Sequence, residues 1–268
     1  MKHFQTIYLY GTDKRQRYLG DMLAKRGFNV IEVSKTSYEI SCLAELTAAE
    51  ESQSEILLLP IPVPKDTLND IIPFIHSESY IIGGILPDYL SDICKLEKAH
   101  IFDYMKVPEV AILNAIATAE GAVCEAIQAG DTNLHSSKCL VIGYGKCGVV
   151  LADKLNGLKA KVKILTTSPE NKAKAIAAGY ALSSDDFSEY DYIFNTAPTM
   201  VITQERIDTL KKECIIIDIA SKPGGTDFDY CESKGITAKL CLGLPAKYSP
   251  KTSAKIIFDE IIKFLDAS

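Results

Sequence analysis

One stretch of the chain, residues 138–152, restricts the possible folds most strongly. An apolar run at 138–142 leads directly into the loop Gly143-Tyr144-Gly145-Lys146-Cys147-Gly148, and a helical pattern follows. This G-x-G-x-x-G spacing is typical of the first turn of a dinucleotide-binding domain. Its first glycine permits a tight turn, its second lacks the Cβ that would block a pyrophosphate, and its third lets the helix approach the strand. The stretch therefore predicts a Rossmann domain whose phosphate site is a helix N-terminus.

Length and charge narrow the class of protein further. A chain of 268 residues is longer than one typical domain, so we expect two. The net charge of -6 and the lack of a long basic run argue against nucleic acid as the main partner. The N-terminus lacks a secretory pattern and no apolar run approaches about 20 residues, so we expect a cytoplasmic protein without a membrane segment.

The cysteines do not predict a metal site. They are spread singly along the chain, without the C-x-x-C pairs of zinc or redox sites. We interpret most of them as small buried apolar side chains. The eight positions are Cys42, Cys94, Cys124, Cys139, Cys147, Cys214, Cys231 and Cys241.

The order of strand-like and helical runs predicts an α/β protein with two doubly wound parallel sheets. Residues 1–113 form the first domain, with strands at 6–10, 29–33, 55–59 and 80–83 and a helix at 14–26. Residues 114–130 form a bridging helix that Asn114 can cap. Residues 131–249 form the Rossmann domain, with strands at 161–165, 192–195, 214–219 and 237–242 and helices at 169–178 and 204–211. Residues 250–268 form a terminal helix, whose apolar stripe is expected to pack back toward the first domain.

The end of the second Rossmann strand predicts the choice of cofactor. An acidic residue there would bind the ribose 2′-hydroxyl of NAD and repel a 2′-phosphate. This chain has Thr166-Thr167-Ser168 instead, with Lys172 one turn later. We therefore predict NADP, with NAD left open. The same hydroxyls also suit the cap of a helix that opens at Pro169, and both roles can hold.

Three further loops leave the predicted carboxyl edge of this sheet. Asn195-Thr196-Ala197-Pro198 follows the fourth strand and is expected beside the nicotinamide half of the cofactor, together with Ala220 and Ser221 after the fifth. Lys222 supplies a cation in the same loop, and the backbone of Gly224, Gly225 and Thr226 can approach a ligand. Lys251 and Thr252 stand at the start of the terminal helix, where a carboxylate is favoured.

The positions of the histidines exclude one chemistry. His3, His76, His100 and His135 all precede the glycine loop, whereas 2-hydroxyacid dehydrogenases of this architecture place their catalytic histidine after the dinucleotide-binding motifs. Glu120 on the bridging helix is the alternative candidate for a proton acceptor, although a surface glutamate is an equally plain interpretation.

Taken together, these motifs resemble those of the family formed by the A subunit of dipicolinate synthase, its NAD(P)-binding subunit. The resemblance covers nearly the whole chain in the right order. Its most specific stretch is residues 218–228, Asp-Ile-Ala-Ser-Lys-Pro-Gly-Gly-Thr-Asp-Phe, followed by 243–245 and 250–252. The residues before the Rossmann domain that carry it are 11–16, with Asp13, Arg15 and Gln16, and 118–121, with Thr118.

The resemblance implies the oxidation of a dihydrodipicolinate to pyridine-2,6-dicarboxylate with NADP, during endospore formation. It also implies, as partner, a flavoprotein-like second subunit. We expect the dicarboxylate in a cleft between the two domains, bound by Arg15, Lys222 and Lys251 and by the hydroxyls of Thr118, Ser221 and Thr252. The predicted substrate site also includes Asp13, Gln16, Asn114, Gly224, Gly225 and Thr226. Two alternatives stay open, another NAD(P)-dependent oxidoreductase of small carboxylates and an NADP-sensing subunit without catalysis. The sequence also leaves a homo-oligomer possible.

Overall fold

The computed structural model describes residues 6–11, 13–33 and 55–267 of the chain. His3, Thr12 and Cys42 lie outside these described residues. The chain divides into two compact units, and each is considered by itself. Unit 1 comprises residues 1–111 and 250–268, and unit 2 comprises residues 112–249.

Unit 1 is built on a five-stranded parallel sheet. Its strands are β1 (Thr6–Tyr10), β2 (Asn29–Val33), β3 (Glu55–Leu58), β4 (Ser79–Gly83) and β5 (His100–Asp103). Their order in the sheet is β2-β1-β3-β4-β5, with all four pairs parallel. The strand order therefore reverses at β1, and the loops after β1 and β3 flank the switch point where α/β ligand sites lie. The last strand, β5, was not predicted.

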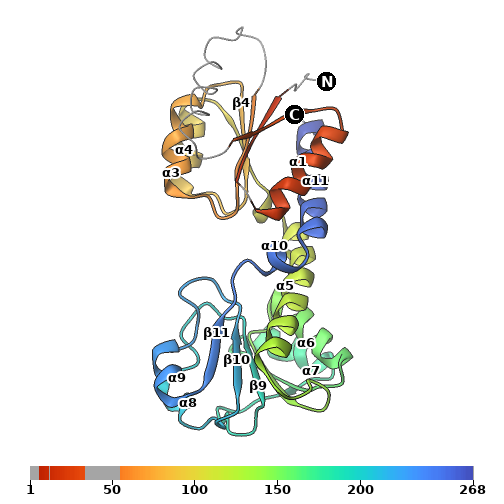
Figure 1. Cartoon of the computed structure of the whole chain (residues 1–268), viewed down its shortest axis with the longest axis vertical. Coiled ribbons are helices and arrows are strands. Elements are labelled where there is room, and N and C mark those ends of the chain that lie inside the picture. Colours follow the sequence, from red (N-terminus) through yellow and green to blue (C-terminus); the bar gives the residue numbers. More distant parts are fainter. Residues whose placement is uncertain (1–5, 12, 34–54, 268) are drawn as a thin grey trace. The chain divides into compact units, whose positions relative to one another are not determined.

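Helices cover both faces of this sheet (Figure 1). On one face α3 (Lys65–Ile71) and α4 (Asp88–Leu96) pack over alternate strand residues such as Tyr8 and Leu57. On the other, α1 (Lys14–Lys25) and α11 (Pro250–Ala267) pack over Ile7 and Ile56. The central strands β1, β3 and β4 are mainly apolar on both sides because both sides are buried, as a doubly wound sheet requires. The stripe of α11 that includes Ile257 and Ile261 lies in this core.

Unit 2 contains a six-stranded parallel sheet. Its strands are β6 (Lys138–Ile142), β7 (Lys161–Leu165), β8 (Ala181–Leu182), β9 (Tyr192–Asn195), β10 (Ile215–Asp218) and β11 (Thr237–Leu240). Their order is β11-β10-β9-β6-β7-β8, which is the Rossmann arrangement with its reversal between β6 and β9. The predicted fold class, two doubly wound parallel sheets, is confirmed.

The helices of unit 2 lie on the two faces of its sheet (Figure 1). One core contains residues of α5 (Pro108–Ala129), α6 (Lys146–Gly157) and α7 (Pro169–Ala177). The other contains residues of α8 (Gln204–Ile207) and α9 (Phe228–Lys234). Helix α8 is shorter than the predicted 204–211, and β8, α9 and the short α10 (Leu244–Tyr248) were not predicted.

The predicted helix cap at Asn114 is wrong. Helix α5 begins at Pro108, six residues earlier, so Asn114 lies inside the helix, where its side chain is buried. We expected no apolar run long enough to span a membrane. In the described part of the chain, however, helix α5 is long and apolar enough to do so by length and composition alone, and half of its most apolar 18-residue segment is buried. Ala119, Ala122 and Ala126 lie in the core of unit 2, which is the position of a core helix.

The cysteines of the described residues are all free thiols. Five of them are buried, at Cys94, Cys139, Cys214, Cys231 and Cys241, as the apolar interpretation predicts. Burial raises the pKa of Cys139 and Cys214 to about 12. Among these described residues no group of three or more metal-ligating side chains comes together.

Candidate dinucleotide site

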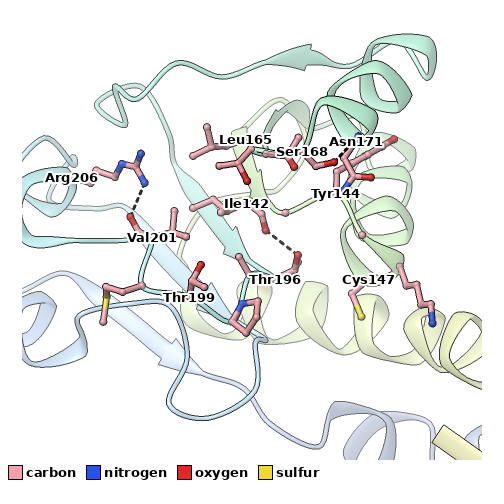
Figure 2. A pocket seen from close by; sticks show the side chains of 18 of the residues that line it. Ile142, Tyr144, Cys147, Leu165, Ser168, Asn171, Thr196, Thr199, Val201 and Arg206 are labelled. Carbon is pink, nitrogen blue, oxygen red and sulfur yellow. Dashed lines mark hydrogen bonds between the residues drawn. The ribbon is translucent and has the colours of Figure 1, made fainter. Parts of the chain in front are cut away.

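A pocket of about 760 Å³ lies at the carboxyl edge of the unit 2 sheet, at the reversal between β6 and β9. Figure 2 shows Tyr144, Ser168 and Asn171 on one side of it and Arg206 and Val201 on the other. Most of the residues predicted to bind the cofactor line this pocket. They are Gly143, Tyr144, Gly145, Lys146, Cys147, Thr166, Thr167, Ser168, Thr196, Ala197 and Pro198.

The glycine loop has the geometry that a dinucleotide needs. Gly143 has φ +88°, in the region that favours glycine, and a Cβ there would lie 2.3 Å from Thr196 Oγ1. Gly145 caps α6 and has open space where a Cβ would stand. A Cβ on Gly148 would meet the Gly143 carbonyl oxygen at 2.1 Å. The first and third glycines therefore hold the turn together, while the second leaves a gap in front of the helix N-terminus.

Charge at this helix end also favours an anion. The first turn of α6 contains no acidic residue, and the exposed Lys146 is its first residue. The positive end of the 12-residue helix and its lysine both stabilise a negatively charged group. The residues present thus fit the pyrophosphate of a dinucleotide.

Asn195 was predicted to bind the cofactor, but it does not line the pocket. It is fully buried, and its amide binds the backbone of Ala197 twice, through Nδ2 to the carbonyl oxygen at 3.0 Å and through Oδ1 from N–H at 3.1 Å. The neighbouring Thr196 hydroxyl donates to the Ile142 carbonyl oxygen at 2.9 Å, which ties the loops after β6 and β9 together (Figure 2). Asn195 therefore shapes the loop, and Thr196 and Ala197 form the pocket wall.

A second, smaller pocket of about 340 Å³ adjoins the first, since Leu165, Thr166, Thr167 and Asp185 line both. Lys172, which was predicted to bind the cofactor, lines only this second pocket. Ser168 also caps α7, because its hydroxyl accepts from the Asn171 N–H at 3.3 Å. A subsite that contains hydroxyl groups, Lys172 and Asp185 therefore adjoins the end of β7, where the ribose 2′ position of a dinucleotide is expected.

Sequence reasoning missed Arg206, which lines the main pocket. Its guanidinium donates to the Val201 carbonyl oxygen at 2.8 Å and lies 5.0 Å from the centre of the Phe187 ring. It also contacts the Asp185 carboxylate at 2.5 Å. Residues 197–203 connect β9 to α8 and place the first turn of that helix at the pocket. No local sequence motif predicts this arrangement, so Arg206 could not be assigned to the site from the sequence.

The loop after β10 is held by Asp218, which was also not predicted as a site residue. Its buried carboxylate accepts from Ala220 N–H at 3.0 Å, Gly225 N–H at 2.8 Å and the Thr226 hydroxyl at 2.7 Å. A Cβ on Gly225 would lie 2.4 Å from the Thr199 carbonyl oxygen. Gly225 and Thr226, predicted to bind substrate, are thus buried in the contact between two loops. Gly224 is buried beside them, and Ala220 and Ser221 do not line the described pocket.

Replacement of Asp218 by alanine is expected to destabilise unit 2 by about 3–5 kcal/mol, because three donors lose their acceptor in a buried place. Urea unfolding measures this loss. Asp229→Ala, on the exposed side of α9, is the control and is expected to change stability by less than about 0.5 kcal/mol. Equal stability of the two variants would contradict the role of Asp218.

A buried carboxylate anchors α10 to α5. Glu125 Oε1 accepts from Lys247 Nζ at 2.5 Å and from the Tyr248 hydroxyl at 2.8 Å. Gly121 permits the approach, because a Cβ there would lie 2.8 Å from Leu244 Cβ. The hydrogen bond from Lys247 lowers the pKa of Glu125 against the effect of burial, and the Tyr248 bond adds to the lowering.

This lowered pKa predicts a pH-dependent stability. Ionised Glu125 stabilises the fold fully above its ordinary pKa of about 4.3, and the contribution disappears as the pH falls through the lower folded value. Glu125→Gln is therefore expected to lower Tm by about 2 to 4 °C at pH 7, with the difference vanishing near pH 3. Thermal denaturation at both pH values measures it, and an equal difference at both would contradict it.

The remaining predicted residues of unit 2 lie outside the described pocket. Glu120 is exposed and pairs with Lys154 of α6 at 3.0 Å. The Thr118 hydroxyl donates to the Asn114 carbonyl oxygen within the same helix at 3.0 Å. Lys222 is exposed on the loop after β10, and its side chain forms no ion pair within the described part of the chain.

The predicted substrate residues of unit 1 gather at the switch point of its own sheet. Asp13 caps α1, accepting from the backbone N–H of Arg15 and Gln16. Arg15 pairs with Asp13 at 2.8 Å and donates to the Ile61 carbonyl oxygen at 3.3 Å, and Gln16 Nε2 donates to the Leu59 carbonyl oxygen at 3.1 Å. Burial would raise the pKa of Asp13, but the bonds from Arg15 hold it below the ordinary value. In the same unit, Lys251 and Thr252 are exposed in the first turn of α11.

Comparison with protein families agrees with the pocket geometry. The family described as D-isomer specific 2-hydroxyacid dehydrogenase, NAD binding domain, matches residues 116–222. This range contains the glycine loop and all the lining residues of both pockets. Unit 2 is therefore similar to the nucleotide-binding domain of a dehydrogenase, and a nicotinamide dinucleotide is the class of cofactor that it binds.

Comparison with individual proteins gives a more specific match than the family model does. The A subunit of dipicolinate synthase from Bacillus subtilis is 34% identical over 190 residues, which are 69% of this chain and 64% of that relative. The matched region thus spans slightly less than two thirds of the curated relative. The crystal structure of the same subunit from Bacillus halodurans has 26% identity and a TM-score of 0.81, covering 97% of each chain. The crystal structure from Bacillus subtilis has 26% identity and a TM-score of 0.80, covering 100% of this chain and 97% of that one.

Proposed function

We propose that this chain, a relative of the A subunit of dipicolinate synthase in sequence and in fold, oxidises a dihydrodipicolinate to dipicolinate with NADP. The observation that carries the proposal is the pocket at the glycine loop, which combines the Gly145 gap, a helix N-terminus and the adjoining subsite with Lys172. The family of the domain supports the oxidoreductase class, and the names of the relatives support dipicolinate as the product. The dihydro substrate is proposed from the resemblance in the motifs.

NADP is proposed as the cofactor because no acidic residue follows β7. Thr166 and Thr167 offer hydroxyl and backbone groups at that place, and Lys172 faces the same small pocket. A 2′-phosphate carries close to two negative charges, which a lysine stabilises and a carboxylate would repel. When bound, the nicotinamide ring supplies the acceptor for a hydride.

The protein's own contribution to the reaction is mainly alignment. Oxidation to an aromatic pyridine ring is favourable in itself, so the chain has to bind the two carboxylates and take up one proton. Arg15, Lys222 and Lys251 are the proposed cations for the carboxylates. Glu120 is the proposed proton acceptor or orienting group, although its contact with Lys154 would first have to open.

Replacement of Lys222 by alanine tests the substrate role. Loss of a charged hydrogen bond to a carboxylate is expected to lower kcat/KM for the dihydro substrate by about ten- to a hundredfold. The Kd for NADPH is expected to stay within about twofold. Steady-state kinetics and calorimetric titration of NADPH separate the two effects. The control is Lys212→Ala, an exposed lysine outside both described pockets. Equal loss of substrate use and of cofactor binding would refute the role.

The biological setting is proposed from the resemblance. A flavoprotein-like second subunit is the proposed partner, the cytoplasm the proposed location, and the synthesis of dipicolinate for endospores the proposed role. Co-purification of the chain with that second subunit, compared with the chain expressed alone, tests the partnership.

The decisive experiment supplies freshly prepared dihydrodipicolinate to the purified chain with NADP or NAD. Formation of NADPH and of the pyridine absorbance at equal rates is the expected result. Binding of NADP without turnover of this substrate would favour a sensing subunit or an oxidoreductase of another small carboxylate. Assays with and without the second subunit, and with other cyclic and linear dicarboxylates, distinguish those two cases.

A further inference from the structure

Four described residues line both the main and the adjoining pocket, and Asp185 is the acidic one among them. It lies three residues after the end of β8, at the same carboxyl edge as Thr166. Its side chain is 82% exposed. A bare carboxylate here would have the effect that an acidic residue after β7 has in NAD-binding domains: it would attract a ribose hydroxyl and repel a 2′-phosphate.

The carboxylate is not bare, because Arg206 contacts it at 2.5 Å. The Arg206 side chain is only 27% exposed, and its guanidinium makes two further contacts, with the Val201 carbonyl oxygen and with the face of the Phe187 ring. Arg206 is therefore the more buried and more extensively bonded member of the pair, and Asp185 the more exposed one. Figure 2 shows Arg206 directed toward Val201 at the border of the main pocket.

We propose that the Asp185–Arg206 pair sets the preference of this site for NADP over NAD, with Arg206 as the specificity-determining residue. Arg206 cancels the negative charge at the border of the two pockets, so that a 2′-phosphate can enter beside Lys172 and Thr166. Without the arginine, the same carboxylate would favour the ribose hydroxyl of NAD. The inference rests on the proposed binding of a nicotinamide dinucleotide and adds the residues that select its phosphorylated form.

The test is a double-mutant cycle that measures Kd(NAD)/Kd(NADP) by calorimetry. Arg206→Gln exposes the carboxylate and is expected to lower the ratio about three- to tenfold. Asp185→Asn leaves the arginine charge unopposed and is expected to raise the ratio by a similar factor. The double variant loses both charges and is expected to return close to the original ratio. The shifts are expected to shrink at 1 M salt, where the screening length falls to about 3 Å.

The ratio separates charge selection from a structural role, because a loosened loop weakens both nucleotides alike. Asp186→Asn is the matched control, since this neighbouring exposed acid lines neither described pocket. A change of ratio in the control as large as that in Asp185→Asn would overturn the inference, as would equal weakening of both nucleotides in Arg206→Gln. If Arg206→Gln does not fold, the Asp185→Asn variant still tests the inference: an unchanged ratio Kd(NAD)/Kd(NADP) in that variant would by itself overturn it. Failure of the unaltered chain to bind either nucleotide would instead refute the proposed function, and the inference with it.

Discussion

Replacement of Gly145 by valine is expected to abolish dinucleotide binding while leaving the fold intact. The position has open space for a side chain and no positive φ, so the protein itself accommodates the substitution. The new methyl groups would fill the gap that a pyrophosphate needs in front of α6. We expect the Kd for NADPH to rise by about 100-fold or more, measured by calorimetry, with Tm almost unchanged.

Gly157→Ala is the control for this experiment. It lies at the end of the same helix, where a Cβ also meets open space, and far along the helix from the phosphate loop. It is expected to keep both the affinity and the stability. Retained NADPH affinity in Gly145→Val would show that no phosphate approaches this loop.

Replacement of Gly148 by alanine, only three residues further on, is expected to have the opposite outcome. A Cβ there would lie 2.1 Å from the Gly143 carbonyl oxygen, and neither backbone segment can move without opening the junction of β6 and α6. We expect a loss of about 3 kcal/mol or more, or a fall of about 6 to 12 °C in Tm.

Thermal unfolding followed by circular dichroism measures this loss, and Gly157→Ala again serves as the control. The loss is expected without any ligand present, which distinguishes it from an effect on binding. An unchanged Tm in Gly148→Ala would mean that the tight contact between strand and helix does not contribute to the stability of unit 2.

Much of the fold could be predicted because its central strands are buried on both faces. Runs such as 6–10 and 192–195 are apolar along most of their length and are bounded by turn residues, and they match the observed strands. Strand β5 was missed because its sequence, His-Ile-Phe-Asp, is short and half polar at an edge of the sheet. The start of α5 was misplaced because Asn114 resembles a cap, whereas Pro108 at the first helical position is the actual signal.

The site was less predictable than the fold, because several of its residues act through tertiary contacts. The glycine loop and Thr166–Ser168 follow a local rule that relates strand ends to phosphates, and they line the pocket. Arg206 arrives through a loop that folds back, and Asp185 through the two-residue strand β8. Asn195 was predicted to bind the cofactor and Asp218 was quoted only within a motif, but both side chains are buried and accept from backbone N–H groups of their own loops, which no local pattern signals.

The interlocking of the loops after β9 and β10 has a consequence for the affinity of a nucleotide. Because Asn195 and Asp218 satisfy the backbone groups of these loops from within the protein, their ordering is completed during folding. An arriving nucleotide then loses little binding energy to conformational entropy. Softening either anchor would lower affinity by restoring disorder to the unliganded state, even though neither side chain touches the ligand.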